Sequence, residues 1–277
     1  MTNPRRPWIW TVVFSVLALA YLYPIFLVLN NSFKNKIYIA RMPFNLPDAK
    51  SFIGLANYEL GISRTNFFAA FGWSLVITLG ATFWIILCTS MTAYWVVRVD
   101  NKFAKFLYML FIFSLVVPFQ MVMFTLSWLA DRLSLTTPWG LWLVYLGFGA
   151  GLAVFIFTGF VKSVPIELEE AALIDGCGPV RTFFNIILPV LKPAIMTVTI
   201  LEVMWLWNDY LLPYLTLDLK KYSTIPIAVQ SLRGGYGAVD MGALMGVLVL
   251  AMIPVIIFYA VAQRHIIQGV VAGAVKG

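Results

Sequence analysis

The chain has 277 residues, of which 61% are hydrophobic and only 11% charged, a balance that excludes an ordinary soluble domain. The formal net charge of +7 does not indicate nucleic-acid binding, because the basic residues form no run and no aromatic platform accompanies them. We therefore expect an all-α polytopic membrane protein with charged loops.

Six apolar stretches are long enough to cross a bilayer, since a helix of roughly 20 residues spans a hydrocarbon core of about 30 Å. The approximate spans are residues 8–31, 70–97, 106–130, 138–161, 193–217 and 241–263. Pro118 is expected to kink the third span. We treat residues 1–277 as a single transmembrane domain.

The first span is interpreted as a retained signal-anchor helix, because its apolar run is too long for a cleaved signal and no small-residue cleavage site follows it. Arg5 and Arg6 precede this span and favour a cytoplasmic amino terminus. Six spans then return the carboxyl terminus to the same side. The Lys and Arg totals on the two sides are nearly equal, so the orientation depends on this local cluster.

The segment 163–190, between the fourth and fifth spans, contains "ELEEAALID" at 167–175, four acids within nine residues. Pro165 suits a first helical turn, and Glu167, Glu169 and Glu170 lie near the positive end of the helix, where each is favoured by ~0.3–1 kcal/mol. Gly176 and the pair Gly178-Pro179 supply a stop and a restart. Two short helices joined by a tight turn are predicted.

The apolar residues of the first short helix do not form one stripe at 100° per residue; they are Ile166, Leu168, Leu173 and Ile174. A helix that is apolar on several sides is typical of a segment that docks into a groove on another protein. The same pattern also fits a helix that packs only on the membrane helices of its own chain, and the residues leave both interpretations open.

The fifth span carries Glu202 and Asp209, ionisable groups costly enough at lipid depth to face the bundle, a cavity or a partner helix. Glu202, Trp205 and Asp209 share one helical face, and Asn208 is adjacent. Carboxyl, amide and indole groups suit the hydrogen bonding and stacking that a polar substrate requires. Helix-to-helix packing explains the same residues, so both roles remain open.

Catalytic and metal-binding motifs are absent from the sequence, including glycine-rich nucleotide loops, His-Glu-x-x-His and Gly-x-Ser-x-Gly. Cys88 and Cys177 lack neighbours at metal-ligand spacing, and His265 lies just past the last span. We expect no catalytic residue and no metal site. A self-sufficient secondary transporter or channel is one function that fits a polytopic membrane protein without catalytic residues, although no clear internal repeat supports it.

Several motifs resemble one family, the membrane permeases of ABC importers. Glu170-Ala171-Ala172, Gly176 and then Ile186-x-Leu188-Pro189 have the spacing of its EAA signature. Further stretches are similar to the second, shorter permease of the maltose-type carbohydrate branch: "SFK" at 32–34, "LPDAKSFIGLANY" ending at 58, "VVPFQMVM" at 116–123, "WNDYLLPYLTL" from 207 and "GVVAGAVKG" from 269.

The resemblance implies a type I importer permease fold, six transmembrane helices with a cytoplasmic coupling helix between helices four and five. It implies that the chain forms half of a translocation path for a carbohydrate, expected to be a di- or oligosaccharide. The implied partners are a second homologous permease, an ATPase dimer that binds ATP and Mg, and an extracytoplasmic sugar-binding protein. The chain itself would be non-catalytic, without a cofactor, in a bacterial or archaeal cytoplasmic (inner) membrane.

The resemblance also assigns roles to particular residues. The residues expected to couple to the ATPase are Glu169, Glu170, Ala171, Ala172, Asp175 and Gly176. The tail expected to reach the ATPase comprises Gly273, Ala274, Val275 and Lys276. The candidates for the substrate path or for helix packing are Glu202, Trp205, Asn208 and Asp209. The loop residues expected to meet the binding protein are Gly234, Gly235 and Tyr236.

Overall fold

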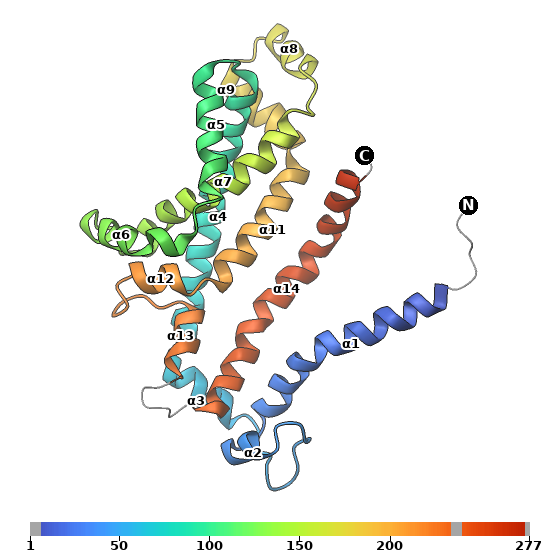
Figure 1. Cartoon of the computed structure of the whole chain (residues 1–277), viewed down its shortest axis with the longest axis vertical. Helices are drawn as coiled ribbons and strands as arrows, with labels where there is room; N and C mark the ends of the chain where they lie inside the picture. Colours follow the sequence, from blue (N-terminus) through green and yellow to red (C-terminus); the bar gives the residue numbers. More distant parts are fainter. Residues whose placement is uncertain (1–6, 234–239, 275–277) are drawn as a thin grey trace. The chain divides into compact units, whose positions relative to one another are not determined.

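The structure is a computed structural model that describes residues 7–233 and 240–274 (Figure 1). Its regular elements there are helices, and the only extended pairing among these residues is an isolated bridge between Lys34 and Phe52. The expected all-α fold class is confirmed. The elements are α1 (Pro7–Ser32), α2 (Lys36–Arg41), α3 (Ala56–Thr65), α4 (Phe67–Arg98), α5 (Lys102–Ser114), α6 (Phe119–Arg132), α7 (Pro138–Val161), α8 (Glu167–Ile174), α9 (Pro179–Thr182), η1 (Phe183–Ile187), α10 (Leu188–Val190), α11 (Lys192–Asn208), α12 (Leu211–Thr216), α13 (Ile225–Ser231) and α14 (Met241–Ala274).

Four of these helices are continuous, long and apolar enough to cross a membrane: α1, α4, α7 and α14. Two bent pairs of helices meet the same criteria of length and composition when each pair is taken together, α5 with α6 at 104° and α9–α10 with α11 at 74°. Counting each pair as one span gives six spans in the described part of the chain. The short helices α8 and α9 lie between α7 and α11, where the coupling segment was expected.

The third span differs from the sequence expectation of one helix over 106–130. Helix α5 ends at Ser114 and α6 begins at Phe119, and the 104° bend between them is far larger than a kink. Pro118 has an extended backbone at the amino-terminal cap of α6. Because proline lacks an N–H and disfavours helical backbone in the preceding residue, the break occurs at this point.

The fifth span was expected to run from 193 to 217, but it breaks after Asn208. Asp209 has an extended backbone, and its Oδ1 accepts a hydrogen bond from the backbone N–H of Leu211 at 3.0 Å. This contact satisfies a free donor in the first turn of α12, and Pro213 occupies that turn without loss of a hydrogen bond. Asp209 therefore ends one helix and starts the next.

The chain divides into two compact units, which are described separately. Unit 1 comprises Met1–Ala69 and Ala228–Val255, and unit 2 comprises Ala70–Ile227 and Ile256–Gly277. In unit 1, the loop after α1 surrounds Lys34, whose Nζ donates to Asn31 Oδ1 and to the carbonyl of Met42, both at 3.1 Å. Asn57 of α3 donates from Nδ2 to the carbonyls of Ser32 and Lys34 at 2.8 Å, which fixes α3 to this loop.

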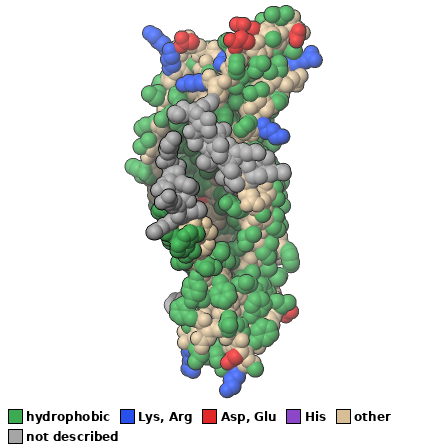
Figure 2. Space-filling model, turned by 90° about the vertical axis from the view of Figure 1, so that its right-hand side faces the viewer, with side chains coloured by type: hydrophobic (Ala, Val, Ile, Leu, Met, Phe, Trp, Pro, Cys, Tyr) green, Lys and Arg blue, Asp and Glu red, His purple; other side chains and the backbone are tan. Residues whose placement is uncertain are grey.

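Unit 2 contains the larger core, formed where α4, α7 and α11 pack together. Its buried apolar side chains include Ile77 and Ile85 of α4, Phe157 of α7 and Val198 of α11. Close approach of α4 to α7 depends on Gly80, where an added Cβ would lie 2.1 Å from Cε2 of Trp142. Figure 2 shows charged side chains gathered around the end of unit 2 that carries α8, with hydrophobic side chains covering the helix flanks below.

Candidate functional site

The coupling segment, defined here as residues 163–190, forms a helix, a turn and a second helical stretch that leads into α11 (Figure 1). The turn is a Schellman motif: Cys177 N–H bonds the carbonyl of Ala172 at 2.9 Å, and Gly176 N–H bonds that of Leu173 at 3.0 Å. Gly176 has φ of +77°, a conformation that favours glycine, and it forms the tight bend that the sequence indicates. Pro179 opens α9.

Helix α8 has an inner face toward its own chain and an outer face toward solvent. Ala172 lies on the inner face and is buried. Leu173 and Ile174 lie on the outer face with 70% and 87% of their surface exposed, and Glu170 is exposed as well. Of the residues expected to couple to a partner, the exposed ones are Glu170, Ala171, Asp175 and Gly176, whereas Ala172 packs internally.

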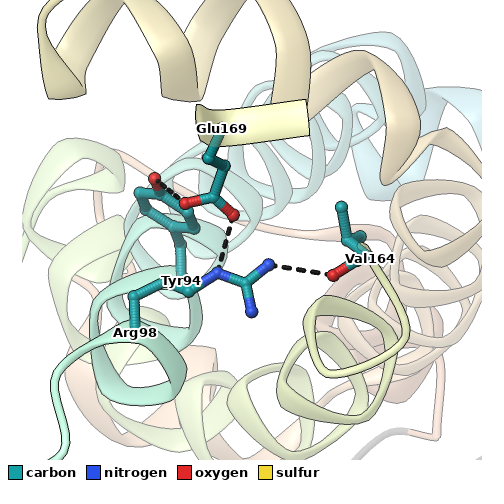
Figure 3. A network of polar contacts seen from close by, with 4 residues as sticks. All are labelled: Tyr94, Arg98, Val164 and Glu169. Carbon is teal, nitrogen blue, oxygen red and sulfur yellow. Dashed lines mark hydrogen bonds and ion pairs between the residues drawn. The ribbon is translucent and has the colours of Figure 1, made fainter. Parts of the chain in front are cut away.

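Glu169 also faces its own chain, where it meets two side chains of α4 (Figure 3). Tyr94 donates its hydroxyl to Oε2 of Glu169 at 2.8 Å, and Nε of Arg98 donates to Oε1 at 2.6 Å. Nη2 of Arg98 donates to the carbonyl of Val164 at 3.1 Å. The side chains of Arg98 and Glu169 are 18% and 13% exposed, so this ion pair is screened less than a surface pair.

The polar face of α11 lies against α7, within unit 2. The hydroxyl of Tyr145 donates to Oδ2 of Asp209 at 2.9 Å, and its ring meets Trp205 edge-on with the centroids 5.5 Å apart. One turn further along α7, a Cβ added to Gly149 would lie 2.9 Å from Oε2 of Glu202. Glu202 is 2% exposed, and this oxygen has no hydrogen-bond partner in the described part of the chain.

Trp205 and Asn208 are partly or largely exposed. Trp205 retains 41% of its surface, and Asn208 donates from Nδ2 to the carbonyl of Met204 in its own helix at 2.7 Å. The structure therefore places Glu202 and Asp209 in the contact with α7 and leaves Asn208 outside it. Tyr145 was not predicted from the sequence; the signal was a hydroxyl within a largely apolar span, four residues before Gly149.

Five of the expected site residues lie outside the part of the chain that the structure describes. Gly234, Gly235 and Tyr236 lie outside the described residues, as do Val275 and Lys276. Gly273 and Ala274 fall in the last turn of α14. Among the residues that the structure does describe, no group of three or more His, Cys, Asp or Glu side chains could hold a metal ion.

Comparison with known proteins identifies the family. Residues 85–271 match the family described as "Binding-protein-dependent transport system inner membrane component". The chain is 39% identical to the "Probable starch degradation products transport system permease protein" of Thermoanaerobacterium thermosulfurigenes, over 94% of each chain. It is 32% identical to the "Arabinooligosaccharides transport system permease protein" of Bacillus subtilis, over 96% of this chain and 95% of that protein.

A solved structure shares the fold. It is the "Crystal structure of a bacterial ABC transporter involved in the import of the acidic polysaccharide alginate", matched with a TM-score of 0.78 and 21% identity over 95% of this chain and 99% of that one. The type I importer permease fold expected from the resemblance is thereby confirmed. The chain belongs to the family of binding-protein-dependent transport system inner membrane components, whose members here are permease subunits and not enzymes.

Proposed function

We propose that this chain is the second, shorter permease of an ATP-driven carbohydrate importer. In this proposal it forms half of the translocation path with a homologous permease, and an ATPase dimer that binds ATP and Mg docks on the coupling segment. An extracytoplasmic binding protein delivers a di- or oligosaccharide. The relatives named for starch degradation products and arabinooligosaccharides support the substrate class.

The observation that carries the proposal is the two-faced geometry of α8. Its inner face is fixed to unit 2 through Glu169 and Ala172, whereas Glu170, Leu173 and Ile174 point outward. Two large apolar side chains beside a carboxylate, presented on a fixed helix, are what a groove on a partner protein would recognise. Packing on its own chain alone does not account for this outer face.

Mechanically, closure of the ATPases around ATP would displace α8, and the permease would respond by a rigid-body rotation between inward- and outward-facing states. The proposal places the chain in a bacterial or archaeal inner membrane, with both termini and the end of unit 2 that carries α8 on the cytoplasmic side. The chain transmits the movement and hydrolyses nothing. A self-sufficient transporter or channel is not favoured, because the family is defined by transport systems that depend on a binding protein.

The fifth-span residues separate into two roles in this proposal. Asp209 holds the α7–α11 contact and the break before α12, since it bonds both Tyr145 and Leu211. Glu202 is buried against Gly149 and is assigned to the same packing. Trp205 and Asn208, which remain accessible, are the better candidates for the substrate path.

Two further contacts belong to the proposal on the strength of the family resemblance. The tail from Gly273 to Lys276 would reach the ATPase, and the loop containing Gly234, Gly235 and Tyr236 would meet the binding protein. Deleting residues 234–237 tests the loop: assembly should persist while uptake falls. Unchanged uptake by an assembled complex would exclude this role for the loop.

The docking of α8 is tested by purifying the tagged chain from its native membrane in a gentle detergent and identifying the proteins that co-elute. A second permease and an ATPase should be recovered. Glu170→Lys should lose the ATPase and keep the second permease, because it places a positive charge on the docking face. The matched control is Glu59→Lys, an exposed acid in the first turn of α3. A chain that elutes alone and still transports would refute the proposal.

A further inference from the structure

The end of α4 contacts both arms of the coupling segment. Tyr94 and Arg98 bond Glu169 of α8, the first arm. The ring of Tyr94 also packs against Phe183, at the start of η1 in the second arm, with the centroids 5.5 Å apart. Phe183 is buried. One turn of α4 is therefore attached to the segment on either side of the Gly176 bend.

Arg98 adds a third attachment. Its Nη2 bonds the carbonyl of Val164, in the connection between α7 and α8. This connection and the Gly176 turn are the covalent links of α8 to the rest of unit 2, and both are short non-helical stretches. Short loops transmit displacement poorly, because their backbone dihedrals can absorb it. A direct side-chain link to a long helix transmits it better.

Helix α4 is well suited to receive such a displacement. It is continuous from Phe67 to Arg98, and inside unit 2 its side chains Ile77 and Ile85 belong to the core shared with α7 and α11. Nε1 of Trp142 on α7 donates to the carbonyl of Val76 at 3.1 Å, which ties the two helices together near the opposite end. A shift applied at Arg98 must therefore move the core of unit 2.

We propose that Tyr94, Arg98 and Glu169 form a clamp that carries movement of α8 directly to α4, so that Glu169 is a positioning residue of the coupling segment and not a contact to the ATPase. The inference rests on the proposed function, because it presupposes that an ATPase moves α8. It separates two adjacent acids by role: Glu170 binds the partner, and Glu169 holds α8 to its own chain. The charge-assisted bonds at 2.6 and 2.8 Å give the clamp defined geometry.

The chain supplies two native reporters, since its two cysteines lie on the two sides of the clamp: Cys177 in the turn after α8 and Cys88 on α4, both free and partly exposed. The experiment measures alkylation of each thiol by N-ethylmaleimide in the purified complex, with and without ATP and vanadate. In the unaltered complex both rates should change on trapping. In Glu169→Gln, Cys177 should still respond, while the response of Cys88 should fall roughly 5-fold or more.

The matched control is Glu167→Gln, an exposed acid in the same first turn of α8 that loses the same helix-dipole contribution but has no part in the clamp. It should leave both responses unchanged.

The charge-swapped pair Arg98→Glu with Glu169→Arg should restore part of the Cys88 response. Recovery would be incomplete because Val164 loses its donor. Should the Glu169→Gln chain itself not fold and not be recovered from the membrane, Tyr94→Phe, which retains the ion pair, provides the milder test and should reduce the Cys88 response alone.

Each contrary result has a distinct meaning. A normal Cys88 response in Glu169→Gln, or none in the unaltered complex while Cys177 responds, would overturn the clamp and leave the proposed function intact. Loss of both responses together with loss of the ATPase would place Glu169 on the docking face and also overturn the clamp. Failure of the unaltered chain to co-purify with an ATPase would instead refute the proposed function.

Discussion

Replacing Tyr145 with phenylalanine tests whether the polar face of α11 is held by packing against α7. The change removes the hydroxyl that donates to Oδ2 of Asp209 at 2.9 Å and retains the ring that meets Trp205. Tyr145 is fully buried, so water does not readily take the place of the lost hydroxyl. The fold should survive with reduced stability.

The magnitude follows from what the structure leaves unpaired. A hydrogen bond between helices in a membrane contributes on average ~0.6 and at most ~1.7 kcal/mol, whereas a buried acceptor that loses its donor costs ~1–3 kcal/mol. Asp209 still accepts a hydrogen bond from the N–H of Leu211 at 3.0 Å, so its carboxyl group does not lose all of its donors. We expect the free energy of unfolding to fall by about 1–2 kcal/mol.

The assay is reversible unfolding of the detergent-solubilised chain by a denaturing detergent, followed by circular dichroism. Tyr21→Phe is the matched control, because Tyr21 is 81% exposed on α1. In an Asp209→Ala background, Tyr145→Phe should cost much less, since its partner is already gone. A loss within about 0.5 kcal/mol, the range of an ordinary surface change, would refute the reasoning and return Asp209 to the substrate path.

Three further outcomes are expected. Gly176→Ala should weaken the cap of α8 by about 1 kcal/mol, because φ is +77° there, and should lower the thermal midpoint more than Gly178→Ala, where φ is −74°. Lys34→Met should reduce the free energy of unfolding by ~1–3 kcal/mol, because it leaves the buried side-chain oxygen of Asn31 without its donor, and Lys50→Met, at an exposed site, should not. Hydrogen bonds from Ser51 lower the pKa of Asp48, so this carboxylate contributes stability above its unfolded pKa that is lost as pH falls through the folded value; Asp48→Asn should flatten the thermal midpoint between about pH 5 and pH 2. A midpoint profile unchanged by Asp48→Asn would contradict that assignment.

Much of the fold could be predicted from the sequence because lipid restricts the choices. Apolar runs free of charge must be helical, since an unpaired backbone is too costly in hydrocarbon. The helices α1, α4, α7 and α14 accordingly appear where the apolar runs lie. Pro118 indicated a kink in the third span, but the 104° bend depends on how α5 and α6 pack on α7 and α12, which no local pattern encodes.

The coupling segment shows the same division at the level of single residues. Its acids, its Gly176 bend and its spacing are readable in the sequence, because caps and turns depend on neighbouring residues. Glu167, Glu169 and Glu170 are equivalent by that criterion, since all three lie in the first turn. Only the tertiary structure distinguishes them, by placing Arg98 and Tyr94 beside Glu169 alone among the three.

The sequence by itself determined that this chain is a membrane-embedded helical subunit with one conspicuous segment outside the apolar spans, because composition and local chemistry suffice for that. The tertiary structure decided which polar groups pair. Tyr145 meets Asp209 across 64 positions, and Arg98 meets Glu169 across 71. Such contacts depend on the relative rotation and depth of packed helices, and these are set by many side chains acting together, not by the spacing within any one helix.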